Sequence, residues 1–173
     1  MKTTYLLLAA LAFAGSALAK GSSADRDFAT QAARDGAGEV ALGRLAVSQG
    51  RSQAVKTFGQ HMVDDHTKAG DELKAAARQD HIDLPSEAQS ERPGTDSIAS
   101  LRGAEFDHAY ARKMVEDHEK AVALFRHETQ SAGDSHVKTF ARKTLPTLEQ
   151  HLRMARELQT QTATNGKADA GKP

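Results

Sequence analysis

Apolar residues recur every three or four positions along most of the chain, the spacing that places them on one face of an α-helix. Glycine and proline divide this pattern into four stretches, at about residues 25–49, 52–79, 96–131 and 135–160. Each predicted helix has one apolar face to bury, and four such helices can bury their faces against one another. The pattern therefore predicts an all-α fold, a four-helix bundle spanning residues 25–160.

The connection between the second and third predicted helices is the longest, and it contains Pro85, Pro93 and Gly94. A helix of about 28 residues is about 42 Å long, and about 13 extended residues could cover that distance. The connection is therefore long enough to cross the whole bundle, whereas the other connections are too short. Both a simple up-down order and an order with one long crossover remain open.

The first 19 residues have the layout of a cleavable secretory signal peptide. Lys2 precedes an apolar run at residues 5–13, and Ala17 and Ala19 have the small-x-small spacing of a cleavage site. The run is shorter than the roughly 20 residues that a membrane-spanning helix needs. We expect cleavage after Ala19, a mature chain without a transmembrane span, and a periplasmic or secreted location that is compatible with outer-membrane association.

The amino-acid composition further limits how the fold can be stabilised and which partners it can bind. The chain has no cysteine, so packing rather than disulfides must stabilise it. Its 23 basic and 23 acidic residues are interspersed, which argues against a nucleic-acid partner. Residues 161–173 are small and polar and are expected to form a disordered tail.

Two histidines end nearly identical phrases, "MVDDH" at His66 and "MVEDH" at His118. Both lie on the apolar face of their predicted helices, four residues after a methionine. His151 lies on the corresponding face of the fourth helix and Glu39 on that of the first. Each helix thus directs one metal-capable side chain inward near its midpoint. Imidazole and carboxylate together suit one divalent transition metal, such as zinc, iron, manganese or copper.

A structural alternative is that the same four residues form a closed network of hydrogen bonds in a non-catalytic envelope or stress-related protein. The polar helix faces would then meet a second copy of the chain or an envelope partner. Asp65 and Asp117 lie about 100° round the helix from the neighbouring histidines, so they can only support a ligand or face solvent. No nucleophile motif or phosphate-binding glycine loop is present, so the sequence indicates no particular reaction. An enzyme with a redox metal remains open, and it would need an open coordination position and a route for substrate.

Several phrases resemble the bacterial family called domain of unknown function 4142, including "VKTFGQHMVDDHTKAGDEL", "LRGAEFDHAYARKMVEDHEKAVALF" and "KTFARKTLPTLEQHLRMARELQ". The resemblance implies a ferritin-like helical bundle that is exported, and it implies no activity. Ferritin-like di-iron sites require a glutamate three residues before the histidine. Val63, Val115 and Leu148 occupy those positions, so a mononuclear site, or no metal site, is expected instead.

Removal of the signal peptide predicts that the mature protein begins at Lys20 or an immediate neighbour. Mass spectrometry of the intact protein, expressed with its native leader, will test this. An Ala19→Arg variant should keep the leader, because a large charged residue does not suit the cleavage position. Finding Met1 at the N-terminus of the exported wild-type protein would show that the segment is an anchor.

Overall fold

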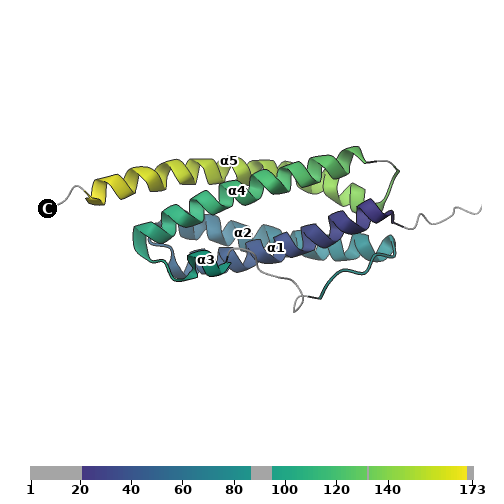
Figure 1. Ribbon diagram of the computed structural model, residues 1–173, viewed down its shortest axis with the longest axis horizontal. Coiled ribbons are helices and arrows are strands. Elements are labelled where there is room, and N and C mark those ends of the chain that lie inside the picture. Colours follow the sequence, from purple (N-terminus) through teal and green to yellow (C-terminus); the bar gives the residue numbers. More distant parts are fainter. Residues whose placement is uncertain (1–20, 87–94, 132, 171–173) are drawn as a thin grey trace, which may run out of the picture.

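Four long helices and one short helix make up most of the computed structural model, which describes residues 21–86, 95–131 and 133–170 (Figure 1). The predicted all-α bundle is confirmed. The predicted signal peptide, residues 1–19, lies outside the described residues. The helices are α1 (Ser23–Gln49), α2 (Gln53–Gln79), α3 (Thr95–Ala99), α4 (Gly103–Gln130) and α5 (His136–Ala170).

Serine side chains cap the N-termini of three of the long helices. Ser22 and Asp25 form a capping box at the start of α1, each accepting a hydrogen bond from the backbone N–H of the other. Ser52 accepts from the N–H of Val55 at the start of α2, and Ser135 accepts from the N–H of Lys138 at the start of α5. These caps satisfy N–H groups that have no partner within their own helix.

The prediction of one continuous third helix at residues 96–131 is wrong in one respect, because this helix is interrupted between α3 and α4. Gly103 has a φ of +62°, a left-handed conformation that glycine adopts without steric cost. Arg102 before it is extended, with φ −140° and ψ 161°. The apolar spacing continues through Gly103, so the pattern alone did not indicate a break there.

The fourth helix is longer than the sequence suggested. It continues to Ala170, beyond the expected end near residue 160. No proline follows Pro146 until the last position of the chain, so no residue in this stretch lacks the N–H that a helix needs. The tail predicted to be disordered is therefore helical as far as residue 170, and residues 171–173 lie outside the described part.

The long helices form two antiparallel hairpins, α1 with α2 and α4 with α5. Across the bundle, α1 lies beside α4 and α2 beside α5. Gly50, at the end of α1, forms a backbone bridge with Gly103, at the start of α4. Asp80, at the end of α2, contacts the start of α5.

It follows that α2 and α4 run in the same direction, and that the chain crosses the length of the bundle between them (Figure 1). Leu84, near the start of this crossover, packs on one end of the bundle, and Ile98 in α3 packs on the other. The structure thus has one long crossover rather than an up-down order. No described helix is both long enough and apolar enough to cross a membrane.

Two buried aspartates hold the hairpins in register, each binding the other hairpin's turn. The Asp107 carboxylate accepts hydrogen bonds of 2.8 Å from the N–H groups of Arg51 and Ser52, at the turn between α1 and α2. The Asp80 carboxylate accepts from the N–H groups of His136 and Val137 at 3.1 and 2.8 Å. Each carboxylate also stabilises the positive end of a helix dipole.

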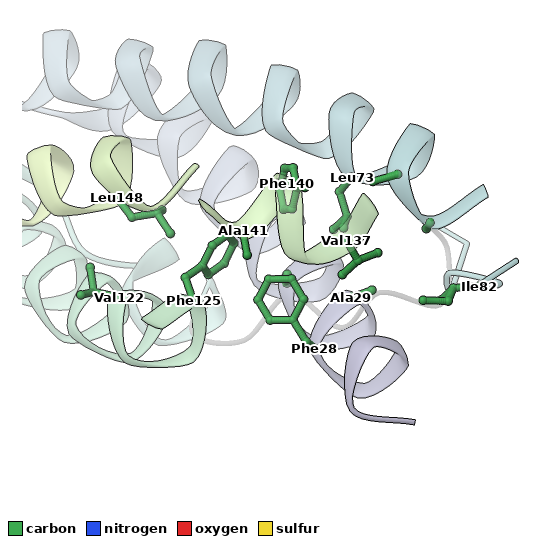
Figure 2. Close-up of a cluster of buried hydrophobic side chains, with 13 residues drawn as sticks. Phe28, Ala29, Leu73, Ile82, Val122, Phe125, Val137, Phe140, Ala141 and Leu148 are labelled. Carbon is green, nitrogen blue, oxygen red and sulfur yellow. The ribbon is translucent and has the colours of Figure 1, made fainter. Parts of the chain in front are cut away.

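The core consists of two apolar clusters, one toward each end of the bundle. The Phe28 cluster, drawn in Figure 2, comprises Phe28, Ala29, Ala32, Leu73, Ala76, Ala77, Ile82, Val122, Phe125, Val137, Phe140, Ala141 and Leu148. The Tyr110 cluster comprises Leu42, Ala46, Val55, Phe58, Met62, Ile98, Phe106, Tyr110, Ala111, Met114, Ala155 and Leu158. Along every long helix, one of the four predicted site residues falls between the two clusters.

Replacing Asp80 by Ala should lower the free energy of unfolding by about 1–3 kcal/mol, because the start of α5 would lose a buried carboxylate that caps it. Urea denaturation followed by circular dichroism will measure the change. Asp83→Ala is the matched control, since Asp83 is exposed nearby and its loss should cost at most about 0.5 kcal/mol. Equal effects of the two substitutions would contradict the capping role.

Candidate metal centre

One polar side chain from each long helix lies in the middle layer of the bundle. Glu39 comes from α1, His66 from α2, His118 from α4 and His151 from α5. Glu39, His118 and His151 are buried and His66 is half-buried. The helical register that places the neighbouring apolar residues in the core also turns these four inward.

The three histidines converge. Each offers one ring nitrogen, and these three nitrogens all lie within 4.8 Å of one another. The ring of His66 is centred 5.6 Å from that of His118 and 5.4 Å from that of His151, and the latter two rings are also 5.4 Å apart. The residues therefore form a compact triad, contributed by three different helices.

Hydrogen bonds set which nitrogen of two of these rings is free. His118 donates from Nδ1 to the Met114 carbonyl oxygen at 2.9 Å, and His151 donates from Nε2 to the Asp65 carboxylate, also at 2.9 Å. Since a neutral imidazole has one N–H, the opposite nitrogen of each ring keeps its lone pair. Asp65 therefore supports His151 through this hydrogen bond, which is one of the two roles that its position on the helix permitted.

Within the described part of the chain, five buried side-chain atoms have no hydrogen-bond partner, and three of them are nitrogens of the triad. They are Nε2 of His66, Nε2 of His118, Nδ1 of His151, Oε2 of Glu39 and the hydroxyl oxygen of Tyr110. An unpartnered buried polar group costs about 1–3 kcal/mol. Four of the five, all except the Tyr110 hydroxyl, belong to the layer between the two apolar clusters, which marks this layer as a site that a ligand could satisfy.

All three imidazoles are neutral at pH 7. Burial lowers the pKa of His118 to about 4 and the pKa of His66 well below its usual value, because a charged ring would lose its hydration. Burial also lowers the pKa of His151, and the hydrogen bond to Asp65 opposes part of that effect. The triad therefore presents unprotonated nitrogens, the form that binds metal.

Glu39 lines the same cavity as the triad, but it is not among the groups whose ligand atoms lie within 4.8 Å of one another. Burial raises its pKa to about 8, and the nearby charge of Asp117 acts in the same direction. Its carboxyl is therefore largely protonated at pH 7 in the metal-free protein. Asp117 itself forms an ion pair with Lys113, at 2.7 Å.

Sequence reasoning missed Tyr110. Its side chain is fully buried, and burial together with the charge of Glu39 raises the pKa of its phenol well above the usual value. Tyr110 lies four residues before Met114 and eight before His118, on the same face of α4. That spacing could have identified it as a core residue with a hydroxyl that needs a partner.

In metal-free protein, the unfolding free energy of the wild type should fall relative to that of Glu39→Gln as pH rises from about 5 to 8. Glu39 has a folded-state pKa near 8, above the unfolded value near 4.5, so folding favours its protonated form and that stabilisation is lost with rising pH. The difference should change by at most about 1.4 kcal/mol per pH unit.

Urea denaturation at several pH values, in the presence of a chelator, will measure that difference. Glu72→Gln, an exposed substitution of the same kind on α2, is the control and should track the wild type. A pH-independent difference between wild type and Glu39→Gln would show that Glu39 does not titrate in a buried position.

Comparison with known proteins places the chain in a family. Residues 10–158, most of the sequence, match the family described as Domain of unknown function (DUF4142). No curated protein and no solved structure gave a match. The chain belongs to the DUF4142 family, whose function its description leaves open.

Proposed function

We propose that the protein binds one divalent transition-metal ion through His66, His118 and His151, with Glu39 as the fourth ligand. The observation that carries this proposal is the convergence of three neutral imidazoles, each of which has a ring nitrogen within 4.8 Å of those of the other two. Each ring also has one buried nitrogen without a hydrogen-bond partner among the described residues. Nitrogens around a tetrahedral zinc ion lie about 3.4 Å apart, so small movements of the three rings would suffice.

The donor set decides which metals fit. Three imidazoles and one carboxylate suit zinc, iron, manganese or copper, and imidazole-rich sites bind copper and zinc more tightly than manganese or iron. A nearby ion would also lower the pKa of Glu39, because its positive charge favours the carboxylate. The Glu39 side chain would then offset part of the ion's charge in the core.

The hydrogen-bond acceptors of the two histidines His118 and His151 support the same function. Metal-bound histidines almost always donate their other N–H to a carboxylate or a backbone carbonyl, which fixes the ring. His151 does so to Asp65 and His118 to the Met114 carbonyl. These bonds hold the two rings in place and leave Nε2 of His118 and Nδ1 of His151 without a hydrogen-bond partner among the described residues.

The structural alternative, a closed hydrogen-bond network, accounts less well for these residues. Such a network would pair the buried polar atoms with one another, yet the three triad nitrogens and Glu39 Oε2 have no such partner in the described structure. A bound ion would use these lone pairs directly. The proposal concerns binding and assigns no reaction to the protein.

We further infer that the protein is an exported, ferritin-like bundle in the periplasm. The single long crossover is the connection found in ferritin-like folds. The expected cleavage after Ala19 would leave the capping box at Ser22, and hence the whole of α1, in the mature chain.

Replacing any one of the three histidines by Ala should lower the affinity for zinc at least about 100-fold, because a ligand is lost from a buried site. Isothermal titration with zinc will measure this. In the wild type, saturating zinc at 100 times its Kd should stabilise the fold by about 2.7 kcal/mol. His127→Ala is the matched control, because His127 is an exposed histidine on α4 and its loss should leave zinc binding unchanged.

A different pattern would favour the structural alternative. If each triad variant is destabilised to the same extent with and without a chelator, and zinc does not stabilise the wild type, then the histidines serve the fold alone.

A further inference from the structure

Each histidine of the triad has a methionine about one helical turn away on its own helix. Two of these methionines precede their histidine by four residues, and the third follows its histidine by three. They are Met62 in α2, Met114 in α4 and Met154 in α5. The chain has no cysteine and no other methionine except Met1, so all its remaining sulfur lies beside the triad.

The three methionines lie on the same side of the triad. Because α5 runs opposite to α2 and α4, a residue after the histidine in α5 falls level with a residue before it in the other two helices. That side belongs to the Tyr110 cluster, in which Met62 and Met114 are fully buried and against which Met154 packs. One helical turn rises about 5.4 Å, so this methionine layer (Met62, Met114 and Met154) is the next layer of the core.

Side chains of both layers can reach the space between them. His118 donates from Nδ1 to the Met114 carbonyl oxygen at 2.9 Å, so its ring lies beside the turn of helix that begins at Met114. Methionine is unbranched and flexible, and its sulfur is polarizable. The unpartnered Nε2 atoms of His66 and His118 therefore have thioether groups about one turn away.

The methionine layer is separate from the cavity that the triad lines. This cavity has a volume of about 520 Å³ and is lined by residues of all four long helices, but by none of the three methionines. At Gly36 and Gly70, which line it, an added Cβ would meet no atom within 4 Å. An ion can therefore approach the triad from the cavity without displacing the methionine layer.

Thioether sulfur discriminates between metal ions. Zinc sites in proteins use thiolate, imidazole and carboxylate ligands. The neutral thioether is a soft ligand that suits copper(I). The single charge of copper(I) also needs less compensation in the core than the charge of a divalent ion, so a carboxylate ligand is not required. Imidazole and thioether together therefore favour copper(I).

We propose that the triad also binds copper(I), with the thioether sulfurs of Met62 and Met114 as ligands in place of Glu39. The inference rests on the proposed metal site, because the histidine nitrogens hold the ion in both cases. It extends that proposal to a soft, monovalent ion and to ligands from the methionine layer.

Competition with the copper(I) chelator bicinchoninate tests this inference, under anaerobic conditions and with ascorbate to keep copper reduced. The wild type should bind one copper(I) per chain. Met62→Leu and Met114→Leu should each weaken copper(I) binding about tenfold or more, because a soft ligand is lost. The zinc affinity of both variants should stay unchanged, since zinc does not use the thioether.

The substitutions separate ligation from packing. A Met to Leu exchange nearly conserves volume and is well tolerated in cores, so each variant should fold. Circular dichroism will check this, and either variant alone decides the matter if the other is unfolded. Leu158→Ile is the matched control, because Leu158 is buried in the same cluster and its exchange removes no sulfur. It should bind copper(I) like the wild type.

X-ray absorption at the copper edge gives a second readout, which packing alone would not change. The copper(I)-loaded wild type should show sulfur bound to copper. That sulfur can only come from methionine, because the chain has no cysteine. The Met62→Leu/Met114→Leu double variant should lose the sulfur signal.

The outcomes separate the two proposals. If zinc binds but copper(I) does not, if the methionine variants bind copper(I) like the wild type, or if the wild-type spectrum shows no sulfur, the thioether ligation is wrong and the metal site stands. An equal loss of zinc and copper(I) affinity in the methionine variants would also overturn it, by showing that the methionines serve packing. If neither ion binds, the proposed function fails first, and the inference that rests on it fails with it.

Discussion

The burial of four polar side chains in one layer is the constraint on which the rest of this bundle depends. Imidazole and carboxyl groups taken out of water must find partners, or the fold loses about 1–3 kcal/mol for each. The bundle places them together, at the level where the Phe28 cluster ends and the Tyr110 cluster begins. Because unpartnered polar groups in this layer lower the stability of the fold, a ligand that binds them only in the folded chain would raise it.

The connections of the chain make this layer possible. The crossover between α2 and α4 lets α1 run beside α4 and α2 beside α5, and the midpoints of all four helices then meet at one height. Asp80 and Asp107 fix that height, because each binds the turn of the opposite hairpin through backbone N–H groups. The close approach of α1 and α2 at Gly43 and Gly59 sets the distance between these two helices at one end of their contact. At the other end the two helices leave room for the cavity.

Much of this could be read from the amino-acid pattern, because helical periodicity needs no tertiary information. The apolar stripes predicted the four long helices and their inward faces, and the inward position of His66, His118 and His151 followed from the same register. The interruption before Gly103 and the length of α5 were mispredicted. The first depends on a left-handed glycine, and the second on how far a helix end continues beyond the bundle, and periodicity determines neither.

The sequence by itself determined which residues face the core, because the side chains on one helix face are fixed by their spacing of three and four. It left open the order of the helices, since a connection of that length permits either arrangement. Tertiary structure decided that the crossover exists, that the three imidazoles lie within 4.8 Å, and that Asp65 and the Met114 carbonyl fix which nitrogens remain free. These features join residues from different helices, and their distances follow from packing, which the spacing along a single helix does not encode.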